Sequence, residues 1–248
     1  MTGIYRMAEL NIKVESLYER VHEYCKDYRT EGEPDFEVVI SQRDIDFERS
    51  KSERNAKYEG KSSFNSSDEY LEELAVYRRI SERMPYYATF LFHGSCIAVD
   101  GKAYLFSAPS GTGKSTHARL WREMLGDRAV MVNDDKPLIR VRDGKVTVFG
   151  TPYNGKHRLG SNIAVPLEAI CVLERAEENS IQPMQAKEIY PKLVQQMYRP
   201  FDSIALVSSL RLLTEMTKSV SLWRLRCNME PEAAAVSFKA MSGSEKDR

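Results

Sequence analysis

The chain has 248 residues, and its 36 Lys and Arg residues balance 36 Asp and Glu residues, so the formal net charge is zero. A balanced charge excludes a strong electrostatic attraction to nucleic acid or to a membrane surface, and neither is expected as a partner. Hydrophobic residues make up 42% of the chain and charged residues 29%, which is the composition of a globular protein with one large or two small domains.

The four cysteines are widely spaced and form no CxxC pair, and the four histidines show no paired ligand spacing. This pattern predicts reduced and mostly buried thiols, and it does not favour a zinc site. No stretch approaches the ~18 apolar residues of a membrane span, and the N-terminus lacks the apolar core of a secretory signal. The expected location is therefore the cytoplasm.

Residues 1–85 predict an α+β region of their own, with substrate recognition as its expected role. Alternating apolar residues predict strands at 10–14 and 36–40. Between them, apolar residues recur at helical spacing and predict an amphipathic helix over 16–28.

The second half of this N-terminal region is more polar. Residues 43–57 carry charges of both signs with little pattern, so we expect a solvated edge or loop there. A polar linker at 61–66 follows. Ser66, with Glu69 three residues later, predicts the capping box of a helix that stops at Pro85.

Residues 86–241 predict an α/β domain with a mixed sheet and hairpins, followed by a disordered tail at 242–248. Two Asp-Gly pairs, at 100–101 and 143–144, each separate two apolar runs and predict hairpins with type I′ turns. The expected elements are strands at 89–92, 96–99, 103–106, 129–133, 138–141, 146–149 and 221–228, and helical segments at 115–125, 186–218 and 231–241.

A Gly-rich segment between a predicted strand and a predicted helix fits the Walker A form, with Ala108 in place of the first Gly. Gly111 and Gly113 let the chain curl so that backbone N–H groups point at a polyphosphate. Lys114 adds a charge for the β and γ oxygens, and the Ser115 hydroxyl can enter a Mg²⁺ shell. ATP and Mg²⁺ are therefore the expected cofactors. The predicted binding residues are Ser110, Gly111, Thr112, Gly113, Lys114, Ser115 and Thr116.

An apolar strand at 129–133 ends in the paired carboxylates Asp134 and Asp135, which resembles a Walker B feature. One Asp can hold Mg²⁺ and the other can accept a proton from an incoming hydroxyl. We assign the metal to Ser115 and Asp134, and catalysis to both carboxylates and Lys114, with the individual roles of the two carboxylates left open. The alternative is a polar turn that opens the following hairpin.

These residues resemble, in order and spacing, the catalytic domain of HPr kinase/phosphorylase, whose core is shared with phosphoenolpyruvate carboxykinase. The resemblance covers about 88–175 and rests on Phe92-His93-Gly94-Ser95, on the phosphate loop and on Asn133-Asp134-Asp135. It implies an active-site role for His93, which taken alone is equally well a strand-end histidine with a satisfied hydrogen bond. It also implies that Asp135 or Asp134 deprotonates a serine hydroxyl. Because members of that family form oligomers, a homo-oligomer is a further expectation.

The chain departs from the family pattern at three places. Thr116 stands where the family usually has Glu, 146–150 holds no carboxylate, and the N-terminal 85 residues do not match the family's N-terminal domain. The acceptor is therefore left open. We expect a Mg-ATP-dependent kinase that phosphorylates a serine of a protein or peptide. The alternatives are a small-molecule kinase on the same core and a non-catalytic ATP sensor or assembly protein.

A last candidate is the loop at 151–160, which brings three potential cations together. Lys156 and Arg158 are expected to face the nucleotide or the acceptor, because a cation can stabilise the charge on a transferring phosphoryl group. The alternative is a solvated basic loop.

Overall fold

The protein is represented by a computed structural model that describes residues 1–58, 60 and 66–243. The linker predicted at 61–66 lies outside the described residues, Ser66 apart. Of the tail predicted at 242–248, Ser242 is the last residue of a helix and Gly243 follows it, and the rest lies outside the described residues. The chain divides into two compact units, Met1–Arg83 (unit 1) and Met84–Arg248 (unit 2). No helix in the described part of the chain combines the length and apolar composition that a bilayer span requires.

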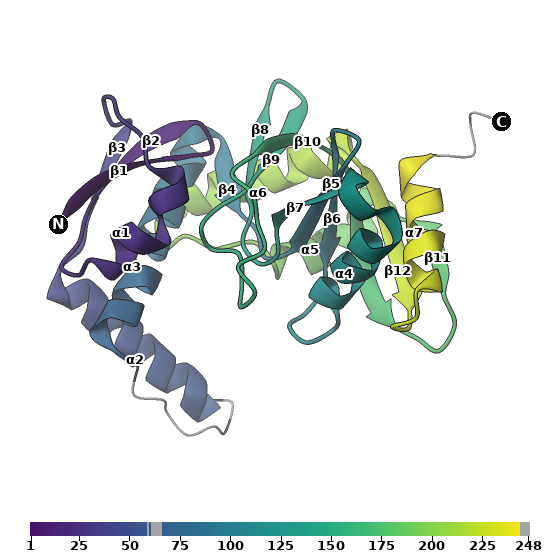
Figure 1. Cartoon of the computed structure of the whole chain (residues 1–248), viewed down its shortest axis with the longest axis horizontal. Helices are drawn as coiled ribbons and strands as arrows, with labels where there is room; N and C mark the ends of the chain where they lie inside the picture. Colours follow the sequence, from purple (N-terminus) through teal and green to yellow (C-terminus); the bar gives the residue numbers. More distant parts are fainter. Residues whose placement is uncertain (59, 61–65, 244–248) are drawn as a thin grey trace. The chain divides into compact units, whose positions relative to one another are not determined.

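Unit 1 is a small three-stranded sheet with helices (Figure 1). Strand β1 is antiparallel to β2, and β2 is parallel to β3. Along β2 the side chains of Leu10, Ile12 and Val14 are buried and alternate with partly exposed ones, as a strand with one face on a core requires. Its elements are β1 (Thr2–Met7), β2 (Leu10–Glu15), α1 (Arg20–Tyr24), η1 (Lys26–Tyr28), β3 (Phe36–Val39), α2 (Gln42–Tyr58) and α3 (Asp68–Arg83).

The helix predicted over 16–28 is much shorter than expected, because its first residues are tied to another element. The backbone N–H groups of Leu17 and Tyr18 donate to the carboxylate of Glu72 on α3, at 2.6 and 2.9 Å. Glu72 is fully buried. The segment therefore begins as an extended connection, and only α1 and η1 are helical.

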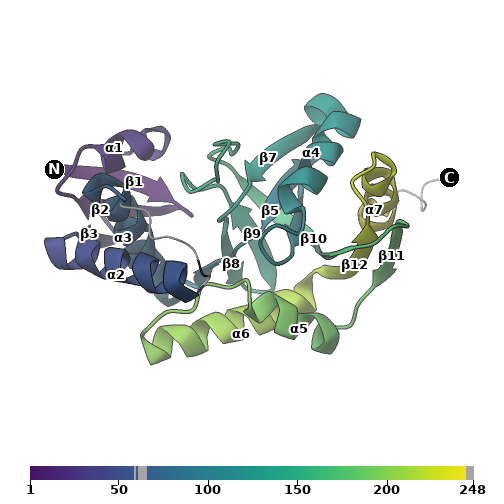
Figure 2. The same ribbon diagram turned by 90° about the horizontal axis from the view of Figure 1, so that it is seen from below.

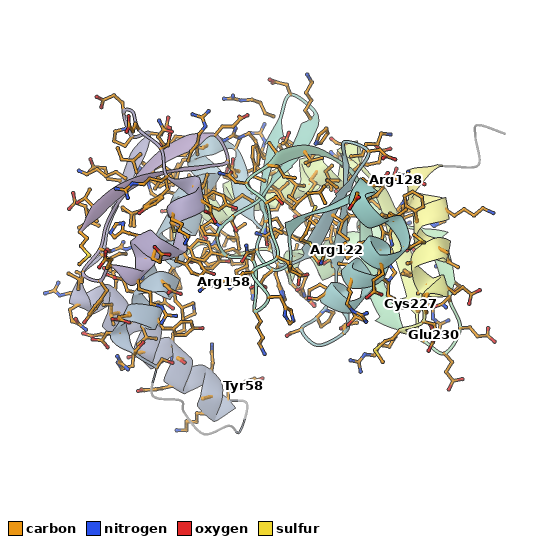
Figure 3. The ribbon with its side chains drawn as sticks, in the orientation of Figure 1. Tyr58, Arg122, Arg128, Arg158, Cys227 and Glu230 are labelled. Carbon is orange, nitrogen blue, oxygen red and sulfur yellow. The ribbon has the colours of Figure 1, made fainter. Side chains whose placement is uncertain are left out.

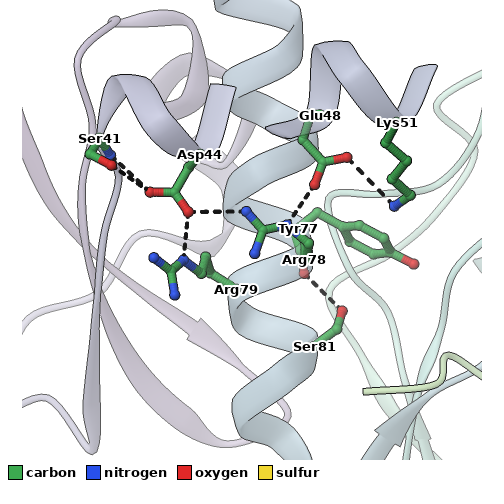
Figure 4. Close-up of polar contacts among 8 residues, drawn as sticks. All are labelled: Ser41, Asp44, Glu48, Lys51, Tyr77, Arg78, Arg79 and Ser81. Carbon is green, nitrogen blue, oxygen red and sulfur yellow. Dashed lines mark hydrogen bonds and ion pairs between the residues drawn. The ribbon is translucent and has the colours of Figure 1, made fainter. Parts of the chain in front are cut away.

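The prediction of a loop over 43–57 is wrong, because this segment is helix α2. Its buried positions include Asp44 and Glu48, which lie one helical turn apart on the face that meets α3. Arg78 of α3 donates to both, at 3.0 Å to Asp44 and 2.6 Å to Glu48 (Figure 4). Arg79 also donates to Asp44, at 2.8 Å. The helix packs through paired charges, so a search for apolar periodicity does not find it.

The start of α3 also differs from the prediction by one residue. The N–H of Tyr70 donates to the Ser67 hydroxyl at 3.4 Å, and the N–H of Leu71 donates to the Ser67 carbonyl at 3.0 Å. Ser67, and not Ser66, therefore stands at the start of the helix.

Unit 2 is built on a nine-stranded mixed sheet with the order β4-β8-β9-β10-β6-β5-β7, extended by β12 beside β10 and by β11 beside β12. This arrangement is an α/β fold, as the sequence predicts. The strands are β4 (Thr89–Leu91), β5 (Ser95–Val99), β6 (Lys102–Ser107), β7 (Ala129–Asn133), β8 (Leu138–Arg142), β9 (Lys145–Phe149), β10 (Ala164–Arg175), β11 (Ser180–Pro183) and β12 (Ser221–Cys227). The helices are η2 (Met84–Tyr87), α4 (Lys114–Leu125), η3 (Gly126–Arg128), α5 (Ala186–Val194), α6 (Ser203–Ser219) and α7 (Glu232–Ser242).

Both predicted hairpins are confirmed. Strands β5 and β6 pair through Asp100-Gly101, and β8 and β9 pair through Asp143-Gly144. All four turn residues have positive φ, between 50° and 77°. That is the conformation a type I′ turn needs at both central positions.

The sheet of unit 2 has a separate apolar core on each face, and β6 contributes to both by alternation. Leu105 joins the core that includes Leu193 of α5 and Leu213 of α6. Phe106 joins the core that includes Trp121 of α4. Figure 2 shows α5 and α6 on one side of the sheet and α4 and α7 on the other. The buried sheet is therefore a rigid support for the loops at its edges.

Candidate functional site

The topology of unit 2 brings three sequence segments to one edge of the sheet. Strands β6 and β7 are each antiparallel to β5, so β6 and β7 run in the same direction. The carboxyl ends of β6 and β7 therefore lie at the same edge as the amino end of β5. The Gly-rich loop, the paired aspartates and His93 follow or precede these three ends.

The Gly-rich loop leaves β6 and leads directly into α4. Gly111 and Gly113 have φ of 78° and 124°, where a residue with a Cβ would be strained. Within the loop, the N–H of Thr112 donates to the Pro109 carbonyl at 3.3 Å. The N–H groups of Gly113 and Lys114 have no backbone partner among the described residues. A curled loop with N–H groups at a helix start is an arrangement that favours an anion.

Arg175, at the end of β10, supports this loop from the neighbouring strand. Its guanidinium donates to the carbonyl oxygens of Thr112, at 3.2 Å, and of Gly111. These bonds engage carbonyl groups of the loop and leave its N–H groups available.

Lys114 is the first residue of α4 and is only 8% exposed. Its ammonium donates to the carbonyl of Ala108 at 2.8 Å. Burial lowers the pKa of Lys114, and the nearby carboxylates of Asp135 and Asp134 oppose this shift. No carboxylate of the described residues lies within ion-pair distance of this ammonium.

Asp134 is buried and is held by hydroxyl groups. The hydroxyl of Ser95, at the start of β5, donates to Asp134 Oδ1 at 2.6 Å. Burial raises the pKa of Asp134, whereas hydrogen bonds from the Ser95 and Ser115 hydroxyls lower it. The arrangement places the hydroxyl of Ser115 beside the carboxylate of Asp134.

Asp135 and His93 form a pair at the opening of the site. His93 Nε2 lies 3.5 Å from Asp135 Oδ1, and both side chains are about one-third exposed, at 34% and 28%. His93 Nδ1 makes a 2.8 Å hydrogen bond with Gln196 Oε1. Burial and the Lys114 ammonium lower the pKa of His93, and the Asp135 carboxylate opposes them. The Gln196 contact fixes the plane of the imidazole ring.

Asn133 shapes the turn that presents both aspartates. Its side-chain oxygen accepts from the N–H groups of Asp135 and Lys136, at 2.9 and 2.6 Å. Its side-chain nitrogen donates to the Thr151 hydroxyl at 3.0 Å. Because an Asn side chain in such a turn replaces a backbone acceptor, it sets the direction in which the two carboxylates leave the strand.

A hollow of about 420 Å³ lies between these groups. Most of the predicted residues line it, including Lys156 of the 151–160 loop, whereas Thr112 and Arg158 do not. Arg158 is exposed on that loop (Figure 3). The lining residues are His93, Ser110, Gly111, Gly113, Lys114, Ser115, Thr116, Asp134, Asp135, Gly155, Lys156 and His157.

The oxygen donors of Ser115 and Asp134 fit a magnesium ion. Mg²⁺ in proteins is held by one or two side-chain oxygens together with substrate phosphates and water. The described residues contain no group of three or more His, Cys, Asp and Glu side chains that could hold a metal. A metal here would therefore depend on phosphate oxygens for part of its shell.

The sequence predicted no role for four residues that contribute to this region. Ser95, Gln196 and Arg175 each hold a predicted residue or the loop in place. His157 lines the hollow although Lys156 and Arg158 were preferred over it. Their contacts join segments far apart in sequence. Ser95 comes next to Asp134 because the neighbouring residues Cys96 and Asn133 pair in the sheet, and this pairing is not visible in the sequence.

The fold and this edge of the sheet define an α/β protein with a Gly-rich loop between a strand and a helix. A family model described as SynChlorMet cassette protein ScmC matches residues 62–230, which is more than half of the chain, and the chain belongs to that family. No curated protein matches the sequence.

One similar solved structure is that of the Hpr(Ser) kinase/phosphatase from Coxiella burnetii. It has a TM-score of 0.35 and 8% sequence identity, and the match covers 62% of this chain and 98% of that chain. A likeness at this level carries no argument about activity.

Proposed function

We propose that this chain is a Mg-ATP-dependent phosphotransferase that moves the γ-phosphoryl group of ATP to the hydroxyl of a serine in a protein or peptide. One observation carries the proposal. Lys114, Asp134, Asp135 and His93 surround a single hollow at the start of α4. A buried cation, two carboxylates and free N–H groups around one hollow are the parts that phosphoryl transfer requires.

The loop would bind the phosphates of ATP. The N–H groups of Gly113 and Lys114, at the helix start, would donate to the phosphate oxygens, and the buried Lys114 ammonium would add a full charge. Lys156, which lines the same hollow, would meet the γ-phosphoryl oxygens. These groups stabilise the charge that develops on the transferring phosphoryl group.

The two aspartates would have different roles, because their surroundings differ. Asp134 is buried against two hydroxyl groups and would hold Mg²⁺ together with Ser115. The ion would neutralise charge on the β- and γ-phosphate oxygens. Asp135 is more exposed and faces His93, so it is the better placed base for an incoming acceptor.

The reaction step balances as follows. The acceptor oxygen forms a bond to the γ-phosphorus, and the bond from that phosphorus to the β–γ bridging oxygen breaks. Asp135 takes the hydroxyl proton, and ADP leaves with the electron pair of the broken bond. His93, held by Gln196, would position the Asp135 carboxylate.

The test uses the full chain with γ-labelled Mg-ATP and serine-containing proteins of a cell lysate. We expect label transfer that Asp135→Asn lowers by about 10²- to 10⁴-fold, the range for a general base. Asp127→Asn is the matched control, because Asp127 is an exposed carboxylate of the same unit outside the hollow. Absence of label transfer, or equal transfer by wild type and Asp135→Asn, would contradict the proposal.

A further inference from the structure

A second hollow of about 440 Å³ adjoins the phosphate site along the exposed side of α4. It shares four residues with the first hollow and adds side chains from the next two turns of the helix. The lining residues are Ser115, Thr116, Arg119, Arg122, Met131, Asp134, His157 and Leu159. Under the proposed function, these shared residues would lie beside the transferring phosphoryl group, at one end of the second hollow.

Arg122 is the distinctive charge of the second hollow. It is partly buried, lies on α4 (Figure 3), and forms no ion pair or side-chain hydrogen bond with any residue that the structure describes. Three other arginines of unit 2 do form ion pairs, Arg119 with Glu123 at 2.7 Å, Arg128 with Asp100, and Arg211 with Glu215. A guanidinium that lines a hollow and forms no ion pair with a carboxylate of the described residues is suited to bind a carboxylate from outside, in a two-bond fork.

Asp134 is the one carboxylate in the lining, and under the proposed function it is not available as a partner for Arg122. Asp134 accepts from Ser95 and Ser115 and would hold the metal. Arg119, which is closer than Arg122 to the start of α4, already pairs with Glu123. Arg122 is therefore the arginine of this lining that is left to recognise an acceptor.

We propose that the second hollow binds the phosphoacceptor and that Arg122 selects a serine peptide with Asp or Glu close to the serine. This inference rests on the proposed function, because it assigns the acceptor of that same site. Met131 and Leu159 offer apolar contact for the stem of the acidic side chain.

The helix geometry sets the spacing of this motif. Arg122 follows Ser115 by seven residues, which is about 10 Å along a helix axis, and its side chain leans back toward the helix start. An extended peptide advances by about 3.3 Å per residue. The acidic residue is therefore expected within about three positions of the serine, and the α-carboxylate of a free serine would be too near its hydroxyl to reach Arg122.

The binding test needs no nucleotide. Two fluorescein-labelled peptides, each with one serine, carry either Glu or Gln at the three positions on each side, and anisotropy gives their affinities for the full chain. We expect the Glu peptide to bind at least about 10-fold more tightly, and Arg122→Gln to reduce this preference to less than 2-fold. Arg211→Gln, an exposed arginine on α6 outside both hollows, is the matched control and keeps the preference. Equal affinity for the two peptides, or an unchanged preference in Arg122→Gln, overturns the inference.

Three further arms separate this inference from the proposed function. Calorimetry with Mg-ATP is expected to give the same dissociation constant for wild type and Arg122→Gln, and an absence of ATP binding would contradict the proposed function while the peptide result stands. Arg122→Lys keeps the charge but loses the two-bond fork, so we expect an intermediate preference for the Glu peptide. This variant also provides a second measurement in case Arg122→Gln does not fold. The third arm tests free serine as the acceptor. If the Glu peptide does not bind, and L-serine binds whereas L-serinamide does not, the carboxylate that Arg122 recognises belongs to a free hydroxy acid, and the assignment to a peptide is overturned.

Discussion

The two units bury charge in opposite ways. In unit 1 the Arg78 guanidinium lies between Asp44 and Glu48, so buried charges are matched by opposite ones. In unit 2 the buried Lys114 ammonium contacts only carbonyl oxygens, and the buried Asp134 carboxylate accepts from hydroxyls. Matched charges inside a fold specify its packing, whereas charges left unmatched around a hollow indicate a ligand from outside.

The largest expected effect on stability is in unit 1. Arg78→Met removes the buried cation that Asp44 and Glu48 share and leaves them only the more exposed Arg79 and Lys51, and breaking such a buried pair costs about 3–5 kcal/mol. Both tryptophans, Trp121 and Trp223, lie in unit 2. Circular dichroism during denaturant unfolding should therefore show an early loss of helix while the tryptophan fluorescence transition stays in place.

The control for this change removes all three charges. Arg78→Met combined with Asp44→Asn and Glu48→Gln is expected to recover most of the lost stability, because no buried charge is left unpaired. If the single and triple variants unfold alike, the charge pairing does not hold α2 to α3. If both variants still bind Mg-ATP, the paired charges of unit 1 contribute to stability and not to the proposed ligand binding of unit 2.

Helix α2 is an element that the sequence did not predict, and its packing explains why. Hydrophobic alternation and the Asp-Gly pairs predict the sheet of unit 2 well, because both signals are local. Helix α2 buries an ionic face, and its charges become meaningful only with Arg78, which lies 34 residues from Asp44. One local signal was available. Ser41 donates its N–H and hydroxyl to the Asp44 carboxylate, and this Ser-x-x-Asp spacing is a capping pattern.

The next largest effect is a loss of stability of unit 2 at low pH. His117 is 2% exposed, with Nε2 on the Ser237 hydroxyl at 2.9 Å, and burial lowers its pKa from 6.5 to about 4. A lowered pKa gives stability that is present above pH 6.5 and is lost as the pH falls through about 4. The difference corresponds to about 3 kcal/mol. Tryptophan fluorescence during urea unfolding at several pH values measures it.

The comparison variant for this loss is His117→Gln, which has no titrating ring. Its unfolding free energy should vary much less between pH 6.5 and 4 than that of the wild type. An equal pH dependence in the two proteins would mean that another group, such as His93, whose pKa is also lowered by burial, accounts for the acid effect.

A smaller acid effect is expected in unit 1, at lower pH. Hydrogen bonds from Arg79, Ser41 and Arg78 outweigh burial and lower the pKa of Asp44 from 3.8 to about 2. The resulting stability, about 2 kcal/mol, is complete above pH 3.8 and is lost as the pH falls through about 2. Circular dichroism of the wild type and of Asp44→Asn between pH 5 and 2 measures this loss, and a wild-type curve parallel to that of Asp44→Asn would show that the pairing gives no such protection.

The candidate site was predicted only in part, for a physical reason. The phosphate loop and the paired aspartates are short local patterns, so their residues could be named from the sequence. Ser95 and Gln196 lie 39 and 103 residues from the side chains they hold, and the order of strands in the sheet decides these contacts. Arg122 was not identified because a lone arginine on a helix has no pattern until its surroundings are known.

The most direct test of the central claim is a calorimetric titration of Mg-ATP into the full chain. Lys114→Gln removes the buried ammonium, and loss of a charged hydrogen-bonding group should weaken binding by about 10- to 100-fold. Lys145→Gln, at an exposed position of β9, is expected to bind as the wild type does. Absence of binding heat with wild type, or equal affinity in wild type and Lys114→Gln, would contradict the account.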